Sequence, residues 1–205
     1  KDLGSVHWSQ ALGANFRYDE NKNVGLYRTL QRKAILETVS LGDVFETNAS
    51  LYADENFTIG NFVVNPALRL DFLRFEYVNK LDSLYNTQNQ VAALLLPKLN
   101  ILYNASESLQ VYAKGGRGFH SNDTRVVVAQ QGKEILPAAW GADAGANFKV
   151  GQWFVGNAAA WFLHLDQEFV YVGDEGIVEP SGKTQRKGVE VSGRIQLTPW
   201  LTADV

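Results

Sequence analysis

Apolar and polar residues alternate along most of the chain, and residues 140–150 (WGADAGANFKV) show this pattern most clearly. A period of two places the two sets of residues on opposite faces of a β-strand, one dry and one wet. The same alternation predicts further strands over residues 8–19, 44–54, 62–72, 93–104, 109–116, 153–166 and 187–197, with a ninth beginning at Leu201. The sequence therefore predicts an all-β fold.

The connections between these strands alternate between short and long. The short ones cover residues 55–61, 105–108, 151–152 and 198–200, and the long ones cover residues 20–42, 78–90, 120–137 and 172–186. In an up-and-down sheet, this order places all short turns at one end and all long loops at the other, as in outer-membrane barrels. Within residues 24–41, Leu26, Leu30 and Ala34 recur every fourth residue, which predicts a short helix.

Charged residues in the middle of the strands fall on the polar face, which is expected if the other face meets lipid. A Lys or Arg that faces lipid at the bilayer midplane costs about 2–4 kcal/mol. A soluble barrel would show the same segregation, so this pattern alone leaves both orientations open. Asn157 does not fit, because it shares a face with Trp161, Leu163 and Leu165.

Two features favour lipid on the apolar side. The apolar faces contain many alanines and could hardly fill a packed core. Aromatic residues gather near the strand ends, where interfacial girdles lie in membrane barrels: Trp8, Tyr18, Tyr103, Trp140, Phe148, Trp153 and Trp200. We therefore expect Trp140 and Phe148 to lie near the two membrane interfaces.

Composition narrows the classes of function. A net charge of −3 gives no basic surface for nucleic acid. The chain has no cysteine, its three histidines are far apart, and no serine or aspartate shows the spacing of a catalytic triad. No apolar run reaches the ~18 residues that a membrane helix needs. We expect no catalytic residues, no cofactor and no metal site.

Several segments resemble TonB-dependent outer-membrane receptors. The stretch YAKGGRGFHSNDTR (112–125) resembles, with one more residue between the tyrosine and Gly-Phe, the Tyr-x-x-x-x-GF-x-S segment that leads from a strand into a loop in that family. NPALRLDF (65–72), LPKLNILYN (96–104) and KGVEVSGRIQLTPWLTADV (187–205) resemble other barrel strands, in the same order. The resemblance implies an antiparallel up-and-down transmembrane β-barrel. Residues 1–205 would form about eight to nine strands of a 22-stranded barrel, without the plug domain and the closing strands.

The resemblance also implies a role and partners. Such a receptor lies in the bacterial outer membrane and takes up a scarce ligand, such as an iron chelate, haem, cobalamin or a glycan, with energy from TonB. Its partners are membrane lipid, its own plug domain, TonB and the extracellular ligand. Candidates for the ligand path or the plug contact are Arg69, Asp71, Lys98, Asp143, Glu190 and Arg194. Candidates in the outer loops are Arg28, Arg117, His120 and Arg125.

Simple solvation is the alternative interpretation for each of these side chains. For the whole chain, the alternatives are a passive porin-like channel and a soluble all-β ligand-binding domain. A passive channel would contain the same strands but no plug, and a soluble domain would bury the apolar faces. In either membrane interpretation, the isolated sheet has unpaired edges and is expected to aggregate.

Overall fold

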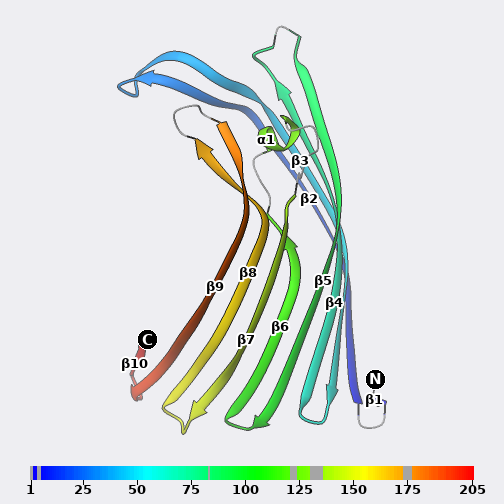
Figure 1. The fold of residues 1–205 in the computed structure, drawn as a ribbon, viewed down its shortest axis with the longest axis vertical. Helices are drawn as coiled ribbons and strands as arrows, with labels where there is room; N and C mark the ends of the chain where they lie inside the picture. Colours follow the sequence, from blue (N-terminus) through cyan, green and yellow to red (C-terminus); the bar gives the residue numbers. More distant parts are fainter. Residues whose placement is uncertain (1, 4–5, 83, 121–123, 130–135, 173–176) are drawn as a thin grey trace.

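The computed structural model of the chain describes residues 2–3, 6–82, 84–120, 124–129, 136–172 and 177–205. Its strands form one antiparallel sheet in which each strand pairs with its neighbours in sequence (Figure 1). The strands are β1 (Asp2–Leu3), β2 (Val6–Leu30), β3 (Ala34–Ile59), β4 (Phe62–Asn79), β5 (Asn86–Ser106), β6 (Leu109–Phe119), β7 (Ala138–Val150), β8 (Phe154–Val172), β9 (Ile177–Thr198) and β10 (Leu201–Asp204). One short helix, α1 (Thr124–Ala129), follows β6.

The nine strands predicted from alternation correspond to β2–β10, so the up-and-down all-β prediction is confirmed. Tight turns join the strands at the lower end of the sheet, and longer projections rise at the upper end (Figure 1). The sheet is open, because β1 and β10 lie at its two edges and do not pair with each other.

Much of what the sequence predicts as long loops is strand instead. β2 and β3 pair from Val6↔Ile59 up to Leu30↔Ala34, and this hairpin bends over at the top of the sheet (Figure 1). The helix predicted within residues 24–41 is therefore wrong. The hairpin closes with Gln31 and Arg32 at positive φ, a conformation that a helix does not contain. Leu30 and Ala34, which are four residues apart in the sequence, pair with each other on either side of that turn.

Register assigns most side chains of the described strands to one of two faces. Residues directly opposite each other on adjacent strands point to the same side of the sheet. We call the inner face the one that carries Arg69 and Asp71 of β4, and the outer face the one that carries Leu68, Leu70 and Phe72. Helix α1 packs on the inner face, where its Val127 and Val128 join a buried cluster with Phe75.

Apolar residues on the outer face form a band with distinct ends. On β4 the band runs from Phe62 to Phe72, and the next outer-face residues are the ion-paired Arg74 and Glu76. The band covers about 33 Å of strand, which a tilt of about 40° reduces to a height of about 25 Å, as in outer-membrane barrels. On β2 the same change follows Tyr18, where Glu20 and Lys22 form an ion pair. The pattern continues on β8, where Phe162 precedes His164 and Asp166.

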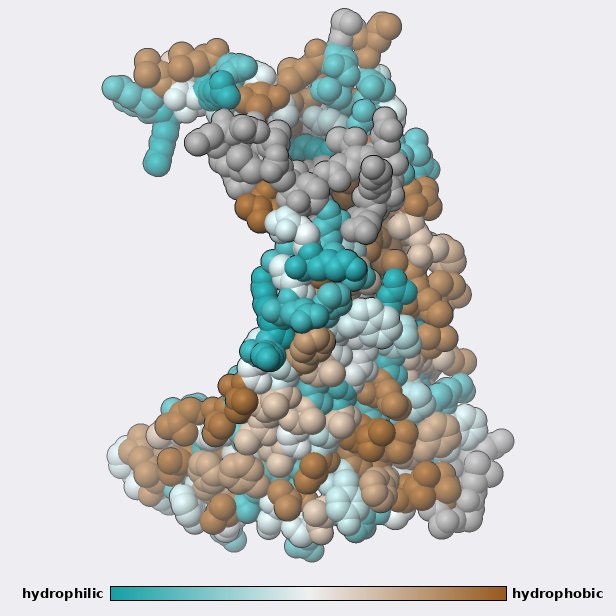
Figure 2. Space-filling view, in the orientation of Figure 1, coloured by the Kyte–Doolittle hydropathy of each residue, from teal (hydrophilic) through white to brown (hydrophobic). Residues whose placement is uncertain are grey.

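Aromatic residues mark the lower end of this band. Outer-face rings from adjacent strands contact one another in three places: Trp8 with Phe57, Phe62 with Tyr103, and Phe148 with Phe154. Phe148 lies beside the lower turn and Trp140 lies near the upper end of β7, as expected from the sequence. Figure 2 shows hydrophobic residues over the lower part of the molecule and hydrophilic residues gathered above them over β8 and β9.

Candidate functional site: the inner face of the sheet

All six ligand-path candidates lie on the inner face. Register connects them, because Asp143 lies opposite Lys114, Lys114 opposite Asn100, and Asn100 opposite Asn65, which shares the phase of Arg69. On the other side, Asp143 lies opposite Trp161, and Trp161 lies opposite Gly188, which shares the phase of Glu190 and Arg194. The strands therefore bring together, on one surface, charges that are up to 125 residues apart in the sequence.

A ladder of side-chain amides crosses the lower part of this face. Asn157 donates to the Oδ1 of Asn147 at 2.7 Å, and Asn147 donates to the Oε1 of Gln110 at 3.1 Å. Gln110 donates in turn to the Oδ1 of Asn104 at 2.8 Å, so the ladder spans β5 to β8. Asn157 also lies 3.1 Å from the Tyr112 hydroxyl. This ladder explains Asn157: the inner face of β8 is polar at its lower end, and Trp161 and Leu163 are inner-face residues above it.

Arg69 and Asp71 form a bidentate ion pair within β4. The Nε of Arg69 lies 2.7 Å from one carboxylate oxygen of Asp71, and a terminal nitrogen lies 2.9 Å from the other. The Asp71 side chain is 1% exposed, whereas that of Arg69 is 42% exposed. The pair neutralises a buried carboxylate and leaves part of the guanidinium open to the inner space.

A recess of about 370 Å³ lies beside this pair and is called the cationic recess below. Its polar lining residues come from four strands: Tyr52 and Asp54 of β3, Arg69 of β4, Lys98 of β5 and Arg117 of β6. The ring of Tyr52 lies directly over Gly13 of β2, where a Cβ atom would overlap it. Glycine at position 13 therefore lets Tyr52 lie flat along the wall of the recess.

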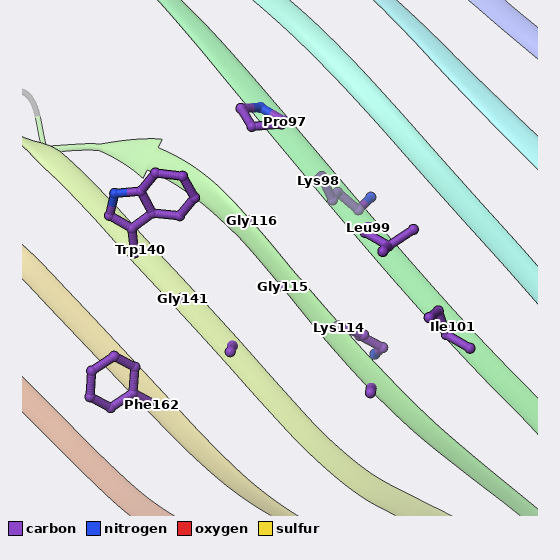
Figure 3. A pocket seen from close by; sticks show the side chains of 12 residues that line it. Pro97, Lys98, Leu99, Ile101, Lys114, Gly115, Gly116, Trp140, Gly141 and Phe162 are labelled. Carbon is purple, nitrogen blue, oxygen red and sulfur yellow. The ribbon is translucent and has the colours of Figure 1, made fainter.

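A second recess, of about 540 Å³, lies further along the inner face. Gly116 and Gly141, directly opposite each other on β6 and β7, are among its lining residues, with Lys98, Asp143 and Trp161. On the other side of the same strands lies an outer-face groove of about 590 Å³. Leu99 and Ile101 flank this groove on one side and Trp140 and Phe162 on the other, with Gly115 and Gly116 between them (Figure 3). The glycines thus make this part of the wall thin on both sides.

The remaining ligand-path candidates lie toward the other edge. Arg194 of β9 forms a bidentate ion pair with Asp204 of β10, at 2.6 and 3.0 Å, and both side chains are exposed. Glu190 lies on β9 opposite Ala159 and is also exposed. These residues share the inner face with the recesses but line neither of them.

Comparison with protein families identifies this arrangement. The model of the "TonB dependent receptor-like, beta-barrel" family matches residues 2–204, which is nearly the whole chain. The chain belongs to this family of TonB-dependent receptor barrels. Members of the family are receptors and transporters of the Gram-negative outer membrane. No curated protein matches the chain.

Solved structures of TonB-dependent receptors share the fold. The unliganded ferric citrate transporter FecA superposes with a TM-score of 0.79 at 17% identity, covering 95% of this chain and 30% of FecA. The ferric-catecholate import receptor Fiu from E. coli K12 gives 0.71 at 16% identity, covering 97% and 34%. The copper transporter OprC gives 0.72 at 13% identity, covering 96% and 33%. The chain thus spans about a third of the length of these receptors.

In this receptor barrel, the four outer-loop candidates lie in different surroundings. Arg28 is exposed on the β2–β3 hairpin and pairs with Glu37 at 3.1 Å. His120 is exposed just after β6, and its backbone N–H donates to the carbonyl of Pro137. Arg125 lies on α1 within 3.3 Å of the Ser40 hydroxyl. Arg117 belongs to β6 and lines the cationic recess.

Helix α1 covers the inner face of the receptor wall at its upper end. Val127 and Val128 pack with Leu73, Phe75 and Tyr77 of β4, and Val44 of β3 and Leu136 complete the cluster. Thr124 is 1% exposed, and its hydroxyl donates to the Glu46 carboxylate. Residues 124–129, which come after β6, therefore lie on the inner side of the sheet.

Sequence reasoning missed Lys114, Tyr52 and Asp54 among the polar residues of the inner face. Strand phase could have found them, because Tyr52 and Asp54 share the face of Arg69 on the paired strand β4, and Lys114 lies opposite Asp143 of β7. The described ranges contain no group of three or more His, Cys, Asp or Glu residues that could hold a metal ion. Nor does any helix in those ranges have the length and apolar character needed to cross a bilayer.

Proposed function

We propose that this chain forms part of the wall of an outer-membrane receptor that imports a scarce ligand with energy from TonB. Its role is to bind and guide rather than to catalyse. The observation that supports this most directly is the division of one continuous sheet into two faces. The outer face carries an apolar band about 25 Å high, and the inner face at the same height carries Arg69, Asp71, Lys98 and Asp143.

The named ligands of the structural neighbours suggest a substrate class. These neighbours are called transporters or receptors of ferric citrate, ferric catecholates and copper. We therefore place a metal-bearing chelate first among the ligand classes considered, ahead of haem, cobalamin and glycans. In the full-length protein, a plug domain would fill the barrel and TonB would act on it from the periplasmic side.

Adjacent cysteines on β4 test the orientation. Arg69→Cys and Leu70→Cys are placed singly in the full-length protein, and cells are treated with a membrane-impermeant maleimide after the outer membrane is made permeable. The 205 residues contain no cysteine that would react in their place. Position 69 should react and position 70 should be shielded by lipid. Strong labelling at position 70 would show that the apolar face of β4 meets water, and it would overturn the assignment of this face to lipid.

A passive porin-like channel would contain the same strands and give the same labelling. The two functions differ in their dependence on energy, because a passive channel conducts its solute without TonB. Growth on a scarce iron chelate should therefore require both this receptor and TonB. Uptake that continues when TonB is deleted would support the passive channel instead.

A further inference from the structure

The cationic recess contains more positive charge than the described residues around it neutralise. Of its three cations, Arg69 is paired with Asp71. Lys98 and Arg117 form no ion pair with any residue in the described ranges. Asp54 is the acidic residue of the lining, and it accepts a hydrogen bond from the side-chain amide of Asn65 at 2.6 Å. The recess therefore has an excess of positive charge.

Arg117 provides a second observation. By register it shares the phase of the outer-face Trp140, and the central carbon of its guanidinium lies 6.0 Å from the centroid of the Trp140 ring. It nevertheless lines the recess, because β6 has separated from β5 at this height. One terminal nitrogen of its guanidinium donates to the carbonyl of Leu95 at 3.3 Å. β6 pairs with β5 only from Lys98↔Gly116 downward, so this carbonyl lies where β6 no longer runs beside β5. The Nε of Arg117 is buried and has no hydrogen-bond partner among the described residues. Such an unsatisfied buried donor of a charged group costs free energy, and an anion would satisfy it.

The position of the recess limits the direction of approach. On β4, Leu73, Phe75 and Tyr77 lie directly above Arg69 on the same face, and they are covered by α1. Leu94 of β5 lies just above Leu96 and packs against the same cluster. The apolar cluster therefore lies between the recess and the upper end of the sheet. An anion reaches Lys98 and Arg117 more directly from the interior of the barrel.

From these observations we propose that the cationic recess is a carboxylate-binding site, in which the Lys98 ammonium and the Arg117 guanidinium hold a carboxylate presented from inside the lumen. An acidic side chain of the segment that fills the barrel is one source of this group, and a free polycarboxylate in the import path is the other. The inference rests on the proposed function in one respect, because it assumes that the inner face lines the lumen of the barrel. The labelling of positions 69 and 70 tests that assumption separately.

Zero-length cross-linking identifies the carboxylate. The full-length receptor in mild detergent is treated with a carbodiimide, which joins an amine to a carboxylate in contact with it, and the products are mapped by peptide mass spectrometry. Lys98 should form an amide with an Asp or Glu outside residues 1–205. Lys149, an inner-face lysine near the lower turn that lines neither recess, serves as the matched control and should cross-link at least threefold less.

Citrate serves as the probe for the second source. If Lys98 forms no cross-link, millimolar citrate should slow the acetylation of Lys98 at least threefold and leave Lys149 unchanged. Whichever readout applies, the cross-link yield of Lys98 or the slowing of its acetylation by citrate, Arg117→Gln should reduce it at least threefold. Arg117→Lys should restore most of that readout. The heat-modifiable mobility of each variant shows that it is folded. The proposal is overturned if Lys98 shows neither a cross-link nor protection by citrate. It is also overturned if Arg117→Gln leaves these readouts unchanged.

Discussion

The membrane-height part of the sheet and the part above it use the same strands with opposite polarity. Between Phe62 and Phe72, the outer face of β4 is apolar and the inner face carries Arg69 and Asp71. Beyond Phe72, the outer face carries Arg74 and Glu76, and the inner face carries Leu73, Phe75 and Tyr77. Side chains keep alternating between the two faces along the whole strand. Above Phe72, however, the apolar residues lie on the inner face and the charged residues on the outer face.

This difference shows that alternation alone does not identify a lipid-facing surface. The upper inner face is apolar because the chain supplies its cover, in the form of α1 and Leu136. The lower outer face is apolar and receives no cover from the described chain, and its side chains are largely exposed, such as Leu12 at 67% and Val191 at 70%. The role of each apolar face therefore depends on whether the chain itself or lipid covers it. Mutations can change either kind of contact.

The largest expected effect comes from removing the centre of the covered cluster. Phe75 is 3% exposed, and Phe75→Ala should weaken the docking of α1 by about 3–5 kcal/mol, because it removes a buried ring and leaves a cavity. Hydrogen exchange in the full-length protein measures this as faster exchange of the amides of residues 124–129.

Arg74→Ala is the matched control, because Arg74 is the preceding residue and points to the opposite face. Its ion pair with Glu76 at 2.7 Å is largely exposed, with 59% of the Arg74 side chain accessible, so its loss should cost less than about 1 kcal/mol. Equal exchange in the two variants would show that the upper inner face does not hold α1.

A smaller effect is expected from a charge on the lipid-facing side. Val191→Arg places a charge on the outer face of β9 and should lower the free energy of unfolding in lipid by about 2–4 kcal/mol if the site lies near the midplane. Ser192→Arg places the same charge on the inner face, one residue away, and should be nearly neutral. Urea titration of the full-length protein in vesicles gives both values. Similar losses at the two positions would remove the distinction between the faces.

The sequence predicted the membrane-height part of the sheet well, because lipid imposes a strict period of two. Residues 140–150 show this: the predicted strand and β7 differ by only two residues, and Trp140 and Phe148 lie at the expected ends. The prediction also placed all six ligand-path candidates on one face. Each strand could be interpreted independently, since the alternation is local and needs no knowledge of its partners.

Above the membrane band the same reasoning failed, for physical reasons. The outer hairpins are solvated, so no constraint of lipid marks their strands, and residues 20–42 looked like a loop with a helix. Helix α1 has six residues, and its position depends on packing against Phe75 and Tyr77, which are about fifty residues earlier in the sequence. Arg117 entered the cationic recess because β6 separates from β5 above Lys98, and sequence periodicity contains no trace of that separation.

The smallest effect concerns the solvated hairpins, which charged contacts join above the membrane band. The Lys80 ammonium lies 2.6 Å from the Asp43 carboxylate, and the backbone N–H of Asn23 donates to it at 2.8 Å. Both contacts, Lys80 first, lower the pKa of Asp43 from its usual 3.8. Because the folded pKa is the lower one, the contribution of this group is complete above pH 3.8 and is lost as the pH falls through the folded pKa.

A spin label on Lys33→Cys, at the turn between β2 and β3, reports the consequence. Its mobility in the full-length protein should be constant above pH 4 and rise at lower pH, as Asp43 is protonated and releases Lys80 and Asn23. Asp43→Asn should give the mobile signal at every pH, because an amide carries no charge to hold the ammonium. The apolar cluster under α1 contains no carboxylate, but the Thr124 hydroxyl of α1 donates to the Glu46 carboxylate. A label on Arg125→Cys is therefore placed in a Glu46→Gln background, where it should not respond over the same range. A parallel response at position 125 would mean that the hairpin and the covered cluster open as one unit, and the two parts of the outer region would then no longer be separable.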